Sequence, residues 1–193
     1  MLTRLRPVAS RLLSRLSARL AVLPADFYTV LGLVMVVPYL YACSLGRPLE
    51  AAILLLAGAA MDALDGAVAR ARGEAGPRGA YLDSLLDRVA DAGYAAGLLL
   101  LGFGVWSVYL LAVGSLLVSY ARARFEALAG GSMEGRGLME RGDRVLALAA
   151  VLLLAASGRW LAAQALLELV VALVWLTFLE RLVAGLRLLG EKG

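Results

Sequence analysis

The chain has 193 residues, of which 62% are hydrophobic, and 19 basic against 15 acidic residues leave a net charge of +4. So large an apolar fraction excludes an ordinary water-soluble domain and indicates an integral membrane protein. The chain has no histidine and a single cysteine, Cys43, which excludes an intrachain disulfide and disfavours zinc or copper sites built on imidazole or thiolate.

The first 22 residues carry a basic amphipathic pattern. Their arginines recur at helical spacing among leucines: Arg4, Arg11, Arg15 and Arg19. A helix of this kind lies in the headgroup region of a bilayer, with its arginines near anionic lipid. We therefore predict a juxtamembrane amphipathic helix over residues 1–22. We attribute the excess positive charge to lipid and phosphate, because no segment resembles a nucleic-acid-binding module.

Residues 23–193 are predicted to form one all-helical membrane domain. A membrane-spanning helix needs about 20 apolar residues. The hydrophobic segments that span or approach this length are 28–46, 50–71, 81–103, 105–127, 143–157 and 160–187. The fold expected is therefore an all-α integral membrane protein with six transmembrane helices. The link 72–79 is rich in glycine and is typical of a short turn.

Basic residues indicate the orientation of these six spans. One side of the predicted topology carries the amino terminus, the 72–79 turn, the connection between spans 4 and 5, and the carboxy terminus, all of which contain arginine or lysine. The other side carries only Arg47 and Arg159. The positive-inside rule therefore predicts a multi-pass protein of the cell membrane with the first side, including the 72–79 turn, in the cytoplasm.

Four aspartates stand in or beside the second and third spans, at Asp62, Asp65, Asp83 and Asp87. A carboxylate at the bilayer centre costs about 3 kcal/mol even on insertion scales, so this group indicates a function. Asp62 and Asp65 are three residues apart and Asp83 and Asp87 are four apart, so each pair lies on one face of a helix. If the two faces meet, the carboxylates repel one another unless divalent cations lie between them.

The chemical type of the candidate ligands indicates which cation would bind. All-oxygen coordination suits Mg²⁺, Mn²⁺ or Ca²⁺. We expect two divalent cations, with Mg²⁺ preferred and Mn²⁺ as the alternative, because paired hard cations typically clamp phosphate oxygens. The structural alternative is that the aspartates make polar contacts between helices. Asp91 extends the second stripe, and a helix-end or second-layer hydrogen-bonding role is as compatible with its position as a catalytic one.

The spacing of these residues resembles a family signature. The pattern D-x2-D-G-x2-A-R-x8-G-x3-D-x3-D over residues 62–87 is similar, without a gap, to that of the CDP-alcohol phosphatidyltransferases. By this resemblance Asp62, Asp65, Asp83 and Asp87 coordinate two metals, and Asp87 is also the candidate catalytic base. The remaining signature residues then line the nucleotide pocket with Asp62 and Asp65: Gly66, Ala69, Arg70 and Gly79.

The start of the first span also resembles the family. Pro24 and Thr29 are similar to its Pro-Asn-x-x-Thr element, although they are one residue further apart here. An ordinary helix start explains this segment equally well.

A second polar stretch concerns the acceptor, which in this family is the alcohol that attacks the phosphorus of the CDP-alcohol. Arginines follow at the end of span 4 and the start of span 5: Arg122, Arg124, Arg141 and Arg144. Guanidinium groups suit an acceptor that itself bears a phosphate. The segments S-Y-x-R-A-R-x-E and E-R-x-x-R resemble those of the inositol-phosphate-using branch, which comprises phosphatidylinositol-phosphate and archaetidylinositol-phosphate synthases. By this likeness the four arginines bind the phosphate of inositol 1-phosphate; the alternative is a cluster that only marks the cytoplasmic side.

The function expected is transfer of a phosphatidyl or archaetidyl group from a CDP-lipid, CDP-diacylglycerol or CDP-archaeol, to inositol 1-phosphate, with release of CMP. Alternatives that keep the chemistry are glycerol 3-phosphate as acceptor, as in a phosphatidylglycerophosphate synthase, or CDP-inositol as donor, as in a di-inositol-phosphate phosphate synthase. A metal-ion transporter is the alternative from another class. Family resemblance also implies a homodimer, with spans 3 and 4 as candidate contacts.

Overall fold

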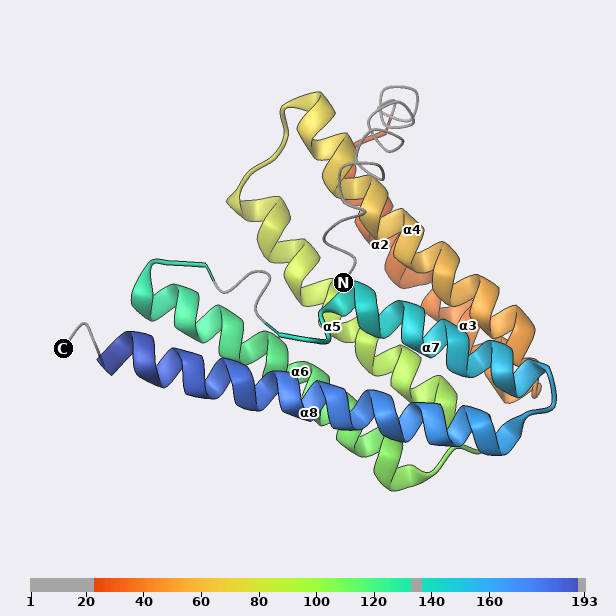
Figure 1. Ribbon diagram of the computed structural model, residues 1–193. Coiled ribbons are helices and arrows are strands. Elements are labelled where there is room, and N and C mark those ends of the chain that lie inside the picture. Colours follow the sequence, from red (N-terminus) through yellow and green to blue (C-terminus); the bar gives the residue numbers. More distant parts are fainter. Residues whose placement is uncertain (1–22, 133–136, 191–193) are drawn as a thin grey trace. The chain divides into compact units, whose positions relative to one another are not determined.

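The computed structural model describes residues 23–132 and 137–190, so the helix predicted over 1–22 lies outside the described part. The described residues are predominantly helical and contain no strand, which confirms the all-α class. The helices follow along the chain as shown in Figure 1: α2 (Ala25–Val34), α3 (Val36–Ser44), α4 (Pro48–Arg72), α5 (Pro77–Leu100), α6 (Val105–Ala129), α7 (Arg141–Ala156) and α8 (Trp160–Gly190).

Four segments of the described chain are long and apolar enough to cross a membrane. They are Ala25–Ser44, Pro48–Arg72, Val105–Ala129 and Trp160–Gly190. They account for four of the six predicted spans. The other two fall short for different reasons: α5 carries three aspartates and two arginines, and α7 has only 16 residues where a simple span needs about 20. The helices are thus those of a membrane protein, and the six-span count stays a prediction.

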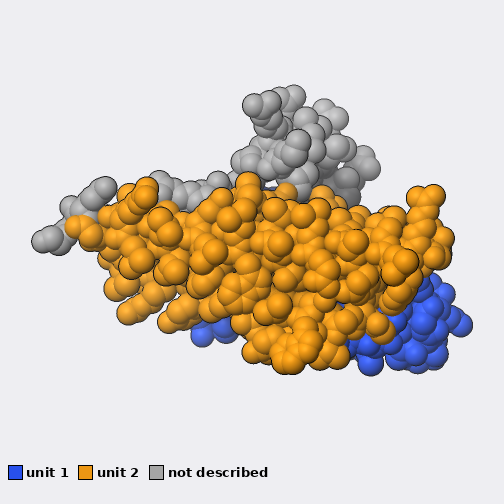
Figure 2. Space-filling model, turned by 60° about the horizontal axis from the view of Figure 1, so that its bottom comes forward, with its two compact units in different colours: residues 1–101 blue, residues 102–193 orange. Residues whose placement is uncertain are grey.

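The chain divides into two compact units, residues 1–101 and 102–193, which are coloured separately in Figure 2. In the first unit, α4 and α5 both pack against α2 and α3. In the second unit, α6 and α7 both pack against α8. The prediction of one functional domain over 23–193 is not tested by this division. The first unit contains the four motif aspartates, and the second contains the four arginines predicted to bind the acceptor.

The first span is interrupted at Met35, where the sequence predicted one helix over 28–46. α2 ends at Val34 and α3 begins at Val36. Pro38, in the first turn of α3, has no N–H with which to bond the carbonyl of Val34, so the regular helical hydrogen-bond pattern cannot continue there. The break gives the first unit two short helices, each of which packs against α4 and α5.

Glycines allow the helices of the first unit to approach closely. A β-carbon added at Gly32 would lie 3.3 Å from the carbonyl oxygen of Gly58, so α2 and α4 are nearly in backbone contact. On α5, a β-carbon at Gly93 would collide with Val36, and one at Gly97 would collide with Tyr39. Small residues therefore set the distances of α4 and α5 from the first span, as expected for helices packed in a membrane.

In the second unit, the segment before α7 is fastened to α8. The backbone amides of Leu138 and Met139 donate hydrogen bonds of 3.2 and 3.0 Å to the Thr177 hydroxyl. Gly137 has φ of +122° and lies where a β-carbon would strike Thr177, so this turn requires glycine. A capping box between Glu140 and Asp143 then starts α7. These contacts place the first turn of α7 beside α8.

Candidate metal centre and arginine cluster

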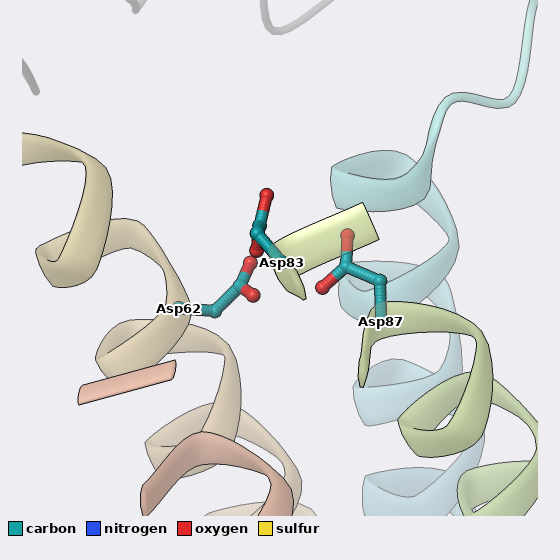
Figure 3. Close-up of side chains that lie close together, drawn as sticks. All are labelled: Asp62, Asp83 and Asp87. Carbon is teal, nitrogen blue, oxygen red and sulfur yellow. The ribbon is translucent and has the colours of Figure 1, made fainter. Parts of the chain in front are cut away.

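Three of the four motif aspartates converge in the first unit. Asp62 lies on α4, and Asp83 and Asp87 lie one turn apart on α5. One carboxylate oxygen from each falls within 4.8 Å of the other two, and Figure 3 shows the three side chains directed toward a common point. At that separation two unit charges repel by about 3 kcal/mol at an effective dielectric constant near 20. The group is therefore an unfavourable arrangement unless positive charge lies close by.

Asp65 lies one turn along α4 from Asp62 and is not within this 4.8 Å group. It is buried near Thr29 and is close enough to Asp62 and Asp83 to interact with their charges. Its Oδ2 atom is buried and has no hydrogen-bond partner among the described residues. A buried carboxylate oxygen without a partner is costly, and a cation is the kind of partner that it lacks.

The donor set fits a divalent cation. Asp62, Asp83 and Asp87 supply hard oxygen ligands from two helices, and the unsatisfied oxygen of Asp65 lies beside them. The one cysteine of the chain, Cys43, is not in this group, and carboxylate oxygens without thiolate or imidazole are the ligands that Mg²⁺, Mn²⁺ or Ca²⁺ prefer.

The turn between α4 and α5 brings the aspartate-bearing faces of these two helices together. α4 ends at Arg72 and is capped by Gly73, whose φ of +68° is the left-handed conformation that closes a helix, and α5 begins at Pro77. Ion pairs flank this turn: Arg72 with Glu74 at 2.6 Å, and Arg78 with Asp26 of α2 at 3.5 Å. The helical hairpin that the sequence predicted over 62–87 is therefore present.

The residues predicted for the nucleotide pocket lie on the two helices of the hairpin, each within about one and a half turns of a motif aspartate along its helix. Gly66 and Ala69 are partly exposed on α4, and the Arg70 guanidinium folds back toward Gly66, where an added β-carbon would lie 3.3 Å from Nη1. Gly79 lies in the first turn of α5, and a β-carbon there would meet nothing within 4 Å. Asp91 is half-buried one turn beyond Asp87 and is not among the converging carboxylates.

Two of the four predicted acceptor arginines belong to a polar cluster in the second unit, which also contains Arg181. Arg144 is buried, and its Nη1 donates to the carbonyl of Met139 at 3.3 Å. Arg122 on α6 pairs with Glu126 at 3.0 Å. Both lie close enough to Arg181 of α8 for their charges to interact. We call Arg122, Arg144 and Arg181 the arginine cluster.

The other two arginines are placed differently. Arg124 is exposed on α6, two residues from Arg122 and so on a different face of the helix. Arg141 is half-buried at the first position of α7.

Arg181 is the residue that the sequence interpretation missed. Its side chain is buried, Nη1 donates to the Val118 carbonyl of α6 at 2.9 Å, and Nη2 lies 3.7 Å from Glu140 Oε1. Its signal was an arginine inside an apolar span, which by itself suggests a site inside a helical bundle. The signal is weak in the sequence, because Arg181 lies within the long apolar segment 160–187. Arg88 lies one residue after the motif, and the motif therefore predicts no role for it.

Comparison with known proteins shows which family the chain resembles. The family model described as CDP-alcohol phosphatidyltransferase matches residues 22–179. The chain is 36% identical to the archaetidylinositol phosphate synthase of Pyrococcus horikoshii, over 94% of each chain. It is 37% identical to that of Aeropyrum pernix, over 93% of this chain and 89% of the relative.

The fold is similar to solved structures of the phosphatidylinositol phosphate synthase of Mycobacterium tuberculosis. Its crystal structure with CDP-DAG bound superposes with a TM-score of 0.77 at 29% identity, covering 91% of this chain and 94% of that one. The structure of the same enzyme with manganese and citrate gives 0.78 at 28% identity, covering 91% and 88%.

Proposed function

The chain belongs to the CDP-alcohol phosphatidyltransferase family, and on that premise we propose that it transfers the phosphatidyl or archaetidyl group of a CDP-lipid to inositol 1-phosphate and releases CMP. The observation that carries the proposal is the convergence of Asp62, Asp83 and Asp87 at the signature spacing. The names of the relatives from Pyrococcus horikoshii and Aeropyrum pernix support inositol phosphate as acceptor and archaeol as the lipid. Family membership sets the transporter alternative aside.

Two divalent cations, Mg²⁺ by preference, are proposed to bind Asp62, Asp65, Asp83 and Asp87. When bound, they would neutralise the diphosphate of the donor and favour departure of CMP. The manganese in the Mycobacterium tuberculosis enzyme supports this assignment. Gly66, Ala69, Arg70 and Gly79 are proposed to line the nucleotide pocket, where the exposed Arg70 can bind phosphate and the glycines leave room close to the backbone.

Asp87 is proposed to accept the proton of the attacking hydroxyl. A hydroxyl of inositol 1-phosphate attacks the phosphorus that carries the lipid, the bond from that phosphorus to CMP breaks, and the hydroxyl proton passes to a carboxylate oxygen of Asp87. The Asp87 side chain is 11% exposed, so it is largely shielded but still reachable. Direct displacement needs no covalent enzyme intermediate, and catalysis then rests on orientation and charge.

The phosphate of the acceptor is proposed to bind the guanidinium groups of the second unit. Arg122, Arg124, Arg141 and Arg144 come from the sequence, and the buried Arg181 adds a fifth. Clustered arginines repel one another, and a phosphate dianion that accepts hydrogen bonds from several of them relieves this repulsion. Arg144 and Arg181 suit this role in particular, because backbone carbonyls already orient their side chains.

We further propose a membrane topology and an oligomeric state for the protein. α5 and α7 would complete six spans by turning their polar residues inward, and the carboxylate end of the hairpin would face the cytoplasm, where basic residues gather. Residues 1–22 would form the interfacial helix, and two copies of the chain would form a homodimer. Cysteine labelling from either side of the membrane at position 74, after Glu74→Cys with Cys43→Ser, tests the orientation.

The test of function is CMP release by the purified full-length protein in detergent with Mg²⁺ and a CDP-lipid. We expect release with inositol 1-phosphate and not with glycerol 3-phosphate. Release only with glycerol 3-phosphate would overturn the acceptor, and release only when CDP-inositol replaces the CDP-lipid would overturn the donor. Archaeol and diacylglycerol donors are compared in parallel to identify the lipid.

A variant series tests the roles of the residues. Asp87→Asn should lower the rate of CMP release by at least about a hundredfold, because general-base catalysis contributes that much or more. Glu74→Gln is the matched control, since Glu74 is a carboxylate of the same hairpin that pairs with Arg72 outside the carboxylate group. Unchanged release by a folded Asp87→Asn protein would remove Asp87 as the base.

A further inference from the structure

Arg88 places a positive charge against the proposed catalytic base. It follows Asp87 on α5, and its Nη2 lies 3.7 Å from Asp87 Oδ2. Its Nε donates a 3.3 Å hydrogen bond to the carbonyl of Ser84, one turn earlier on the same helix. The side chain therefore folds back along α5, with one edge on the backbone and the other toward the carboxylate. Arg88 lies outside the family signature, which ends at Asp87.

This ion pair has a direct consequence for the carboxylate group. Asp62, Asp83 and Asp87 repel one another, and a guanidinium 3.7 Å from one of them offsets part of that repulsion. A divalent cation among the same three carboxylates would bring a second, larger positive charge within a few Å of Arg88. The guanidinium and the cation then repel each other and compete for the oxygens of Asp87.

The Arg88 side chain is accessible from outside the carboxylate group. It is 28% exposed, and its Nε bonds to the neutral carbonyl of Ser84. A guanidinium that leaves Asp87 remains within reach of whatever lies against the carboxylates, because its stem is anchored one residue away. Phosphate oxygens are the partners that a guanidinium binds best.

We propose that Arg88 is a displaceable counter-ion: it pairs with Asp87 until a divalent cation takes its place, and it then binds a phosphate oxygen of a substrate. This inference rests on the proposed function, because it needs both a metal site and phosphate-bearing substrates. The phosphate belongs either to the diphosphate donor or to the phosphorylated acceptor, and both present the same chemistry. An ion pair with no such role would affect neither the binding of the cation nor that of the substrate phosphate.

The first experiment measures Mn²⁺ binding to the full-length protein in detergent by the loss of the free-ion EPR signal, without nucleotide. Arg88→Gln should bind Mn²⁺ about three- to tenfold more tightly than the wild type, because it removes a competing charge. Arg88→Lys keeps the charge and should stay near the wild type. Arg72→Gln is the matched control, since Arg72 pairs with Glu74 outside the carboxylate group. Unchanged or weaker Mn²⁺ binding by Arg88→Gln overturns the proposal.

The second experiment measures KM and kcat at saturating Mn²⁺. Arg88→Gln should raise the KM of one substrate by about tenfold, as expected for loss of a charged hydrogen bond, and Arg88→Lys should restore part of it. A higher KM for the CDP-lipid assigns the phosphate to the donor, and a higher KM for inositol 1-phosphate assigns it to the acceptor. An unchanged KM for both overturns the second half of the proposal.

These measurements separate the inference from the proposed function. Mn²⁺ binding by the wild type without CMP release would overturn the function, while the Mn²⁺ series would still decide whether Arg88 competes with the cation. If the wild type binds no Mn²⁺, both the metal site and the competition are overturned. Normal binding and CMP release with no effect of Arg88→Gln would overturn the inference alone.

Discussion

The hydroxyl of Tyr39 on α3 donates a 2.8 Å hydrogen bond to the backbone carbonyl of Tyr94 on α5, and the two rings meet edge to face with centroids 5.1 Å apart. Tyr39 is completely buried. This pair fastens α5 to the first span, against which α4 also packs. The carboxylates of α4 and α5 thus owe their spacing partly to residues that do not touch them.

Removing the Tyr39 hydroxyl should cost stability. Tyr39→Phe keeps the ring and loses one buried hydrogen bond, which is worth about 1 kcal/mol. We expect a lower midpoint of thermal unfolding in detergent. Tyr41→Phe is the control, because Tyr41 is 65% exposed and should unfold as the wild type does. Equal midpoints for the two variants would contradict a structural role for the bond.

Adding a methyl group at Gly97 should separate α3 from α5. A β-carbon there would collide with the Tyr39 ring, which is rigid and buried, so Gly97→Ala should destabilise the protein by about 1–3 kcal/mol. It should also weaken Mn²⁺ binding, since α5 carries Asp83 and Asp87. Gly142→Ala serves as the comparison, because a β-carbon at Gly142 meets nothing within 4 Å. Mn²⁺ affinity equal to wild type in Gly97→Ala would show that the carboxylate spacing does not depend on this contact.

Divalent cations should stabilise the folded protein. A ligand that binds only the native state adds about 2.7 kcal/mol at a concentration of one hundred times its Kd. The midpoint of thermal unfolding should therefore rise with added Mn²⁺ or Mg²⁺ and return to its starting value after chelation. Asp83→Asn should reduce this rise, since Asp83 is one of the converging ligands. A rise of the same size in that variant would mean that the cations act elsewhere on the protein.

Arg181 should affect the acceptor more than the donor. Arg181→Lys keeps a charge but loses the geometry that bonds Val118 and faces Glu140, so the KM for inositol 1-phosphate should rise by about tenfold while that for the CDP-lipid stays constant. Steady-state kinetics with each substrate varied in turn measures the difference. Arg187→Lys, at an exposed position on the same helix, is the control. An equal rise in both KM values would indicate general disruption of α8.

Local patterns in the sequence determined the elements of this protein. Helical periodicity and apolar length predicted the helices, and the glycine-rich link 72–79 predicted the turn between α4 and α5, because these depend on residues close together in the chain. The signature spacing predicted which aspartates share a helix face, and three of the four do converge. The break at Met35 could have been inferred from Pro38, although the apolar run concealed it.

Contacts between distant residues were decided only by the tertiary structure. Arg181 of α8 bonds to the Val118 carbonyl of α6 and lies close to Glu140, which caps α7. These contacts join three helices, and no local pattern encodes them. The buried, unpaired oxygen of Asp65 and the contact of Arg88 with Asp87 depend on side-chain rotamers. Spacing along a helix fixes the direction in which a side chain leaves the backbone. Only the packing of neighbouring helices decides whether that side chain meets a partner, a cation site or lipid.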